Sequence, residues 1–225
     1  MRFNFLKGDW LKMARKSEFS PEDIVQAGFS LVDKMGIDQL TARNLAEELG
    51  SSTAPVYSNF NNMEELEVAL TEEAISRLLT RTKSGSSDDP FANIGFGVLD
   101  FAWQHPRWYE ALFLVKTPHT DPGIKIMEEL LKAMDSMDHF RELDITERTI
   151  VLKKMAIFTH GVATEICLRG GDENSREEWK ILLNEVGNTI VDDAHQRAPR
   201  SAREFEILGS LCECSRNQNP EKEEN

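Results

Sequence analysis

Apolar residues recur at three- and four-residue intervals along most of the chain, and no segment shows the alternation of a half-buried strand. The first stripe predicts a helix that begins after Ser20, where an N-cap, a proline and two acids stand in order, and that ends at Gly36. The repeated apolar positions of this helix are Ile24, Gly28, Leu31, Val32 and Met35. The pattern therefore predicts an all-α fold.

Residues 40–60 predict two short helices joined by a tight turn. Thr41 is a good N-cap for the first helix, and Gly50 can adopt the left-handed conformation that ends it. Ser52 is the expected N-cap of the second helix, whose first turn tolerates Pro55 because the missing N–H has no helical partner there. This second helix is expected to present Thr53, Tyr57, Ser58 and Asn59 outward, as the major groove of DNA requires.

Further stripes predict a series of helices over the rest of the chain. They cover residues 63–82 after an N-cap at Asn62, 91–104 after Pro90, 107–115, 124–137, 147–169 after an N-cap at Thr146, and 176–196 after an N-cap at Ser175. A loop is expected over 84–89, and a short amphipathic helix over 199–214. The helix over 147–169 is apolar nearly all round, which predicts burial on most of its sides.

A set of positions between Phe19 and Leu70 carries a family resemblance. The set comprises Leu40-Thr41, Leu45-Ala46, Leu49-Gly50, Tyr57, Phe60 and Leu66. In these positions the segment, about a quarter of the chain, resembles the DNA-binding domain of the tetracycline-repressor (TetR) family. Two residues depart from the family pattern: Ser51 replaces an aliphatic residue, and Met63 replaces a lysine. The second change removes a phosphate contact, so operator affinity is expected to depend on other residues.

The resemblance implies contacts with double-stranded operator DNA. The residues expected to make them are Arg43, Ser52, Thr53, Ala54, Pro55, Tyr57, Ser58 and Asn59. Arg43 can pair with guanine through two hydrogen bonds or bind a phosphate, and the sequence leaves both roles open. The predicted helix-turn-helix domain spans residues 19–65.

The net charge of −13 is distributed unevenly. Residues 1–60 contain seven Lys or Arg and eight Asp or Glu, a balance of −1, so residues 61–225 carry the remaining −12. Acids held more than ~8 Å from the DNA are largely screened in the cell. Residues 1–18 contain Lys12, Arg15 and Lys16, and form either a basic arm that reaches DNA or a frayed terminus or extension; both interpretations remain open.

Residues 66–215 are expected to bind a ligand and to form a dimer. Phe101-Ala102, His105-Pro106, Tyr109, Phe113 and His160-Gly161 resemble the ligand-binding domains of part of the TetR family. The candidate pocket residues for a small apolar or aromatic effector are Trp103, Trp108, Phe113, Met155, Phe158 and His160. Aromatic and methionine stripes are commonly plain core, and a histidine like His160 more often satisfies a neighbouring group than a ligand.

The two long helices over 147–169 and 175–196 are adjacent and joined by glycines, and the first has more apolar surface than a monomer needs. TetR-like proteins dimerise through their last two long helices, so pattern and resemblance agree on a homodimer. The candidate interface residues are Met155, Phe158, Val162, Leu183, Val186 and Ile190.

Other classes of function lack a pattern in the sequence. No apolar run approaches ~18 residues, so neither a membrane span nor a membrane partner is expected, and a cytoplasmic location is. Cys212 and Cys214 are too close together for a structural zinc site, and Cys167 is expected to be a reduced thiol. No metal, cofactor or catalytic residue is expected. Residues 216–225 are expected to be disordered.

These features favour a ligand-responsive transcriptional regulator, a repressor released from a palindromic operator by a small molecule. Two alternatives remain open. One is an α-helical ligand-binding protein or enzyme with a vestigial helix-turn-helix. The other is a DNA-binding adaptor that works without a small effector.

Overall fold

Helices are the regular elements of the structure, a computed structural model that describes residues 19–85, 87–115, 122–170, 172–197 and 204. In chain order they are α1 (Pro21–Met35), the 3-10 turn η1 (Ile37–Gln39), α2 (Ala42–Glu48), α3 (Ala54–Asn59), α4 (Met63–Lys83), α5 (Pro90–Gln104), α6 (Pro106–Phe113), α7 (Pro122–Met134), η2 (Asp138–Phe140), α8 (Ile145–Arg169) and α9 (Glu173–Gln196). The described residues contain no strand, and the predicted all-α fold is confirmed. The basic residues of 1–18, Cys212 and Cys214, nearly all of the predicted helix over 199–214, and the predicted tail lie outside the described residues.

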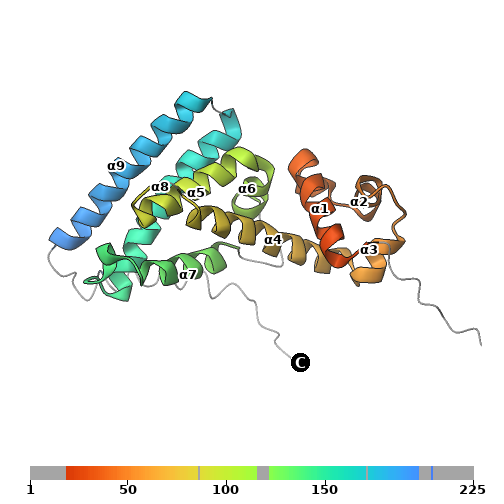
Figure 1. The fold of residues 1–225 in the computed structure, drawn as a ribbon, viewed down its shortest axis with the longest axis horizontal. Helices are drawn as coiled ribbons and strands as arrows, with labels where there is room; N and C mark the ends of the chain where they lie inside the picture. The colour runs from red at the N-terminus through yellow and green to blue at the C-terminus, as the bar shows by residue number, and fades with distance from the viewer. Residues whose placement is uncertain (1–18, 86, 116–121, 171, 198–203, 205–225) are drawn as a thin grey trace, which may run out of the picture.

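The helices form two groups joined by α4 (Figure 1). Helices α1 to α3 lie at one end of the molecule, α5 to α9 lie at the other, and α4 runs from the first group into the second. The predicted domain boundary after residue 65 falls inside α4, which continues unbroken from Met63 to Lys83. A movement of α4 therefore displaces residues in both groups of helices.

Helix α1 begins after Ser20, as the sequence predicts, and a reciprocal pair of hydrogen bonds fixes its start. The Ser20 hydroxyl accepts from the Asp23 N–H over 3.2 Å, and the Asp23 carboxylate accepts from the Ser20 N–H over 2.8 Å. These bonds hold the pKa of Asp23 below its usual range. The apolar stripe of the helix then buries Ile24, Leu31 and Val32.

Some of the predicted helix boundaries are wrong. Helix α8 is capped by Asp144, not Thr146, because the Asp144 carboxylate accepts from the N–H groups of Thr146 and Glu147. Helix α9 is capped by Asp172, which accepts from Ser175, so Ser175 lies in the first turn. Helix α7 ends at Met134 rather than near residue 137, and the chain turns into η2.

A close approach of two helices ties α4 to the second group. A Cβ atom on Gly97 of α5 would lie 2.5 Å from the backbone N and Cα of Thr82 of α4. Only glycine permits that separation, since real Cβ atoms do not approach backbone so closely. The end of α4 is therefore held against α5.

One continuous cluster of buried apolar side chains extends from α1 to α9. It includes Leu45 and Val56 of the helix-turn-helix, Leu70 and Leu78 along α4, and Leu152 of α8. Burial of each such side chain contributes about 1.5–3 kcal/mol, so the two groups of helices stabilise each other through this core.

Candidate functional site

The helix-turn-helix forms around the residues that the sequence indicates. Thr41 caps α2 by accepting from the Asn44 N–H over 3.1 Å, and Gly50 ends the helix with φ 62°. The predicted cap of α3 is displaced by one residue. Thr53 occupies the N-cap position without a side-chain bond, while the Ser52 hydroxyl accepts from the Ala54 N–H over 3.4 Å. Pro55 lies in the first turn, as predicted.

Most of the predicted DNA-contacting side chains share the open surface of this motif. Arg43 on α2 and Ser52, Thr53, Ala54, Tyr57 and Ser58 at α3 are exposed, Pro55 is half-buried, and Tyr57 keeps 55% of its surface open to solvent. The Ser58 hydroxyl donates to the Pro55 carbonyl over 2.9 Å.

Asn59 is not presented outward as the sequence predicted. Its side-chain amide donates to the backbone carbonyls of Phe19 and Pro55, over 3.3 and 2.8 Å. Asn59 therefore ties the end of α3 to Phe19, the residue before the N-cap of α1. The reason is its place as the last residue of α3, where its amide lies within reach of the chain that enters α1.

The electrostatics of the motif depend on very few cations. Residues 19–65 contain two basic residues, Lys34 and Arg43, against eight acidic ones. The Lys34 ammonium lies 2.6 Å from the Glu48 carboxylate and holds the pKa of Glu48 below its usual range. Arg43 is thus the exposed cation of the motif that forms no ion pair within the described part of the chain.

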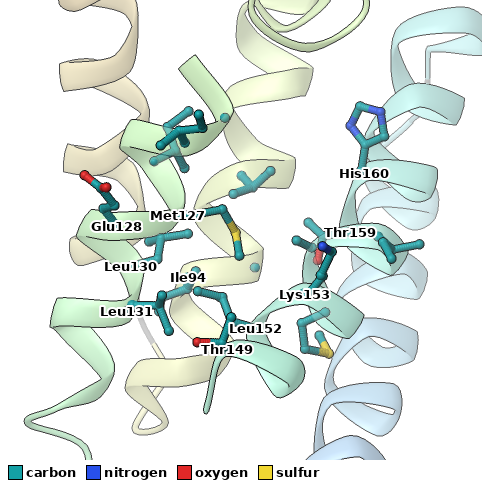
Figure 2. Close-up of a pocket in the computed structure, with 18 of the residues that line it drawn as sticks. Ile94, Met127, Glu128, Leu130, Leu131, Thr149, Leu152, Lys153, Thr159 and His160 are labelled. Atoms are coloured by element: carbon teal, nitrogen blue, oxygen red, sulfur yellow. The ribbon is translucent and has the colours of Figure 1, made fainter. Parts of the chain in front are cut away.

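A cavity of about 620 Å³ lies in the second group of helices, between α5, α7 and α8, with α6 closing one end (Figure 2). Its volume falls inside the ~300–1,000 Å³ range of small-molecule sites. The wall is mainly aliphatic: Ile94 and Val98 come from α5, Met127 and Leu131 from α7, and Leu152 from α8. This cavity can hold a small apolar molecule.

Half of the predicted pocket residues line this cavity, and half do not. Phe113, Met155 and His160 are in the wall. Trp103, Trp108 and Phe158 are not among the residues that line it. Phe158 packs against the core, while the Arg176 guanidinium lies 5.2 Å from the centre of the Trp103 ring, on the side of α9. The wall residues that the prediction missed come mainly from α5, α7 and α8, whose helical spacing was visible but gave no sign of facing a cavity.

A tyrosine–histidine pair lies at the α6 end of the cavity. The Tyr109 hydroxyl and His160 Nδ1 are 2.8 Å apart, and the ring of Phe113 lies 4.6 Å from that of Tyr109. Burial raises the pKa of the Tyr109 phenol and lowers the pKa of the His160 imidazole. Both groups are therefore neutral near pH 7. His160 therefore satisfies a neighbouring group, Tyr109, and that group also lines the cavity.

Trp108 lies at the junction of the two groups of helices instead of in the cavity. Its indole N–H donates to the Phe29 carbonyl of α1 over 3.0 Å, and the two rings stack. Beside them, His105 Nδ1 lies 2.9 Å from the carboxylate of Asp33, also on α1. Helix α6 therefore contacts the cavity with one side and α1 with the other.

The predicted dimer residues are mostly used within one chain. Met155, Val162 and Leu183 are buried, and Phe158, Val186 and Ile190 pack against the core. Leu183 lies directly over Gly95 of α5, so α9 buries its stripe against α5 and α8. Other apolar side chains of these helices are open to solvent, namely Ile145, Ile157, Leu168, Ile181 and Leu182. Ile157 is 68% exposed and Leu168 75% exposed, so the predicted burial of α8 on most sides is not achieved within one chain.

Two kinds of feature are absent from the described residues. Among them, no group of three or more His, Cys, Asp and Glu side chains is placed to hold a metal ion. No helix within the described ranges is long and apolar enough to cross a membrane.

Similar proteins share both the motif and the fold. Over 114 residues the chain is 28% identical to an uncharacterised HTH-type transcriptional regulator of Mycobacterium tuberculosis, covering 49% of this chain and 52% of that one. Over 73 residues it is 32% identical to the class A tetracycline repressor of transposon 1721 from Escherichia coli, covering 32% and 34%. The chain thus spans about half and a third of the lengths of these two relatives. No family model matches the sequence.

Solved structures agree over most of the chain. A variant of TetR from Acinetobacter baumannii AYE, in complex with minocycline, superposes with a TM-score of 0.56, covering 81% of this chain and all of that one, at 17% identity. A TetR-family regulator from Streptomyces coelicolor gives 0.59, covering 87% and 97% at 14% identity. Fold and motif together describe an all-α protein with a helix-turn-helix, similar in fold to TetR-family regulators. Its resemblance to the TetR family, predicted from the sequence, is confirmed in sequence and in fold. The names of these proteins are those of regulators and repressors, not of enzymes.

Proposed function

We propose that this chain is a ligand-responsive transcriptional regulator that binds operator DNA as a homodimer. The observation that carries the proposal is the physical connection between its two candidate sites. An exposed helix-turn-helix and an apolar cavity of about 620 Å³ are linked by two helices, α4 and α6. A molecule bound in the cavity contacts both links, because Leu78 of α4 and Tyr109 of α6 line the wall.

DNA binding is supported by the surface of α2 and α3. Arg43, Thr53 and Tyr57 are exposed together with the N-terminal end of a short helix, which suits insertion into the major groove. The named relatives are transcriptional regulators, and one is a tetracycline repressor. By analogy with these relatives, the chain represses transcription. It acts in the cytoplasm, where the DNA lies.

Dimer formation is supported by the apolar surface left open on α8. Ile157, Gly161 and Leu168 follow one another at intervals of four and seven residues, which places them along one side of the helix. A two-fold symmetric pairing of this side would cover those residues and place two recognition helices on one DNA duplex. Half-sites one helical turn apart, or a multiple of it, require a spacing of about 34–36 Å per turn.

Release by an effector follows from a change in that spacing. To weaken DNA binding ~100-fold, the effector must favour the non-binding state by about 2.7 kcal/mol. A few buried apolar contacts supply that amount if they differ between the two positions of α4 and α6. The coupling is reciprocal, so operator DNA weakens effector binding by the same factor.

The test is selection of binding sites from a randomised duplex DNA library, followed by mobility-shift titration of the enriched sequence and of the DNA flanking the protein's own gene. The expected result is an enriched inverted repeat bound by two chains. Failure to enrich any sequence would reject the regulator and leave a ligand-binding protein with a vestigial motif. An enriched site whose affinity no small molecule alters would instead favour an adaptor without an effector.

A further inference from the structure

The chemistry of the cavity wall narrows the class of effector, and this step rests on the proposed function. Most of the wall is aliphatic. Its polar members among the described residues are Tyr109, Glu128, Thr149, Lys153, Thr159 and His160. The Thr149 hydroxyl already donates to the Ile145 carbonyl over 2.7 Å. The threonines are uncharged, so the character of the wall is set by the Tyr109–His160 pair and by the two charged residues.

The Tyr109–His160 pair offers a neutral donor and a neutral acceptor to a ligand. If the phenol donates to Nδ1, the imidazole keeps an N–H at Nε2 and the phenol oxygen keeps a free lone pair. If Nδ1 donates to the phenol oxygen, the phenol keeps its O–H and Nε2 becomes the acceptor. Either arrangement provides one donor and one acceptor without charge. A ligand hydroxyl can donate or accept at such a pair and a carbonyl oxygen can accept from its donor, whereas a hydrocarbon can form neither bond.

The charged residues give the described part of the wall no net charge. Glu128 is exposed on α7, and Lys153 is half-buried on α8 and takes part in another interaction within the chain. Figure 2 shows Lys153 below His160, nearer the start of α8, and Glu128 on α7 across the cavity. Seven residues, two helical turns, separate Lys153 from His160, which is about 10 Å along the axis. A carboxylate beside His160 would lose its water without a nearby cation of the described wall to replace it.

We propose that the cavity binds an uncharged, mainly aliphatic molecule whose hydroxyl or carbonyl oxygen lies at the Tyr109–His160 pair. The apolar tail extends between Ile94, Met127 and Leu152, whose side chains offer aliphatic and thioether surface. Phe113, with its ring centre 6.0 Å from that of His160, lies beside the oxygen at this end of the cavity.

The experiment is competition against a neutral apolar fluorophore, N-phenylnaphthylamine, bound to the full-length protein. The competitors share one chain and differ only in the end group: decane, decanol, and decanoate at neutral pH. Decanol is expected to displace the probe at about five- to tenfold lower concentration than either decane or decanoate, the size of one hydrogen bond gained in a dry site. His160→Phe should remove the advantage of decanol over decane. His160→Gln, which keeps a neutral donor and acceptor, should retain it. Lys153→Gln should leave the order unchanged.

Two results would overturn the inference while leaving the proposed function intact. One is tightest binding by decanoate that is lost in Lys153→Gln, which would place an anionic head at Lys153. The other is an unchanged decanol-to-decane ratio in a folded His160→Phe variant, as judged by circular dichroism. If neither the fluorophore nor any competitor binds, both the inference and the effector half of the proposed function fail. Operator binding, measured separately by mobility shift, then tests the DNA-binding part of the proposed function.

Discussion

Trp108 of α6 and Phe29 of α1 are joined twice: their rings stack with centres 4.9 Å apart, and the indole N–H donates to the Phe29 carbonyl over 3.0 Å. Trp108 is only 1% exposed. The next residue, Tyr109, lines the cavity. Successive residues of one helix thus contact the candidate effector site and the first helix of the helix-turn-helix domain. A displacement of α6 by a ligand must move α1 or break this contact.

Loss of the indole N–H should destabilise the whole protein. Trp108→Phe keeps an aromatic ring but removes the hydrogen bond and leaves a small void, and we expect a loss of about 1–3 kcal/mol in the free energy of unfolding. The measurement is urea denaturation followed by circular dichroism. Trp103→Phe is the matched control, because the Trp103 indole nitrogen is buried without a partner among the described residues. This control should lose less than Trp108→Phe, and equal losses would show that the Phe29 bond contributes nothing.

The position of Trp108 also illustrates what the sequence could and could not predict. Its aromatic neighbours in the chain indicated a pocket, and a pocket exists. Adjacent helical residues, however, diverge by about 100°, so Trp108 and Tyr109 cannot face the same partner. Which of them faces the cavity depends on where α1 and α8 lie around α6. That arrangement depends on tertiary packing, which helical spacing alone does not predict.

The helix caps show a similar limit. The sequence offers two good capping residues at each of two helix starts, Asp144 with Thr146 and Asp172 with Ser175. All four residues are of types that cap well, so preference alone does not choose between positions two or three apart. The helix-turn-helix was predicted more closely because its turn requires Gly50 and its first helix has a single capping candidate in Thr41.

Base readout is expected to depend on Arg43. Arg43→Ala should weaken binding to the selected operator by about 1–3 kcal/mol and relax the preference at one position of each half-site. The measurement is mobility-shift titration against operators altered at one base pair at a time. Lys34→Ala is the control, since the Lys34 ammonium already contacts Glu48 and should leave affinity nearly unchanged. Equal weakening on every sequence would assign Arg43 to a phosphate instead.

The basic side chains that attract the DNA phosphates are expected to lie largely outside the described residues. Residues 1–17 contain five of the seven basic side chains of residues 1–60. Deleting residues 1–17 should weaken operator binding and reduce the slope of log affinity against log salt by about 0.9 for each phosphate that this segment neutralises. The measurement is fluorescence anisotropy across a salt series. A truncated protein with the full slope would show that this segment is a terminus that does not touch DNA.

The dimer prediction changes with the structure. A charge at Leu183, which is 1% exposed, should unfold the chain rather than only separate two chains, so it is a poor probe of the interface. Ile157→Glu and Leu168→Glu change exposed residues and should give folded monomers with little operator affinity, because one motif makes too few contacts. Analytical ultracentrifugation measures the outcome. Met35→Glu alters an exposed apolar residue on α1 and should remain dimeric. If the Ile157→Glu and Leu168→Glu variants remain dimeric, the interface lies elsewhere on the chain.

The last prediction concerns acid and His160. Burial lowers the pKa of its imidazole in the folded protein, whereas the unfolded chain keeps a value near ~6.5. Below that value the unfolded state binds more protons, so the contribution of His160 to stability is fully present above about pH 6.5 and is lost as the pH falls. The phenol facing it stays neutral, because burial raises the pKa of Tyr109. His160→Gln removes this titration, so the free energy of unfolding of the wild type minus that of the variant should decrease as the pH falls from about 7.5 to about 5. Urea denaturation at a series of pH values measures the difference, and a difference independent of pH would show that the folded protein protonates His160 as readily as the unfolded chain does.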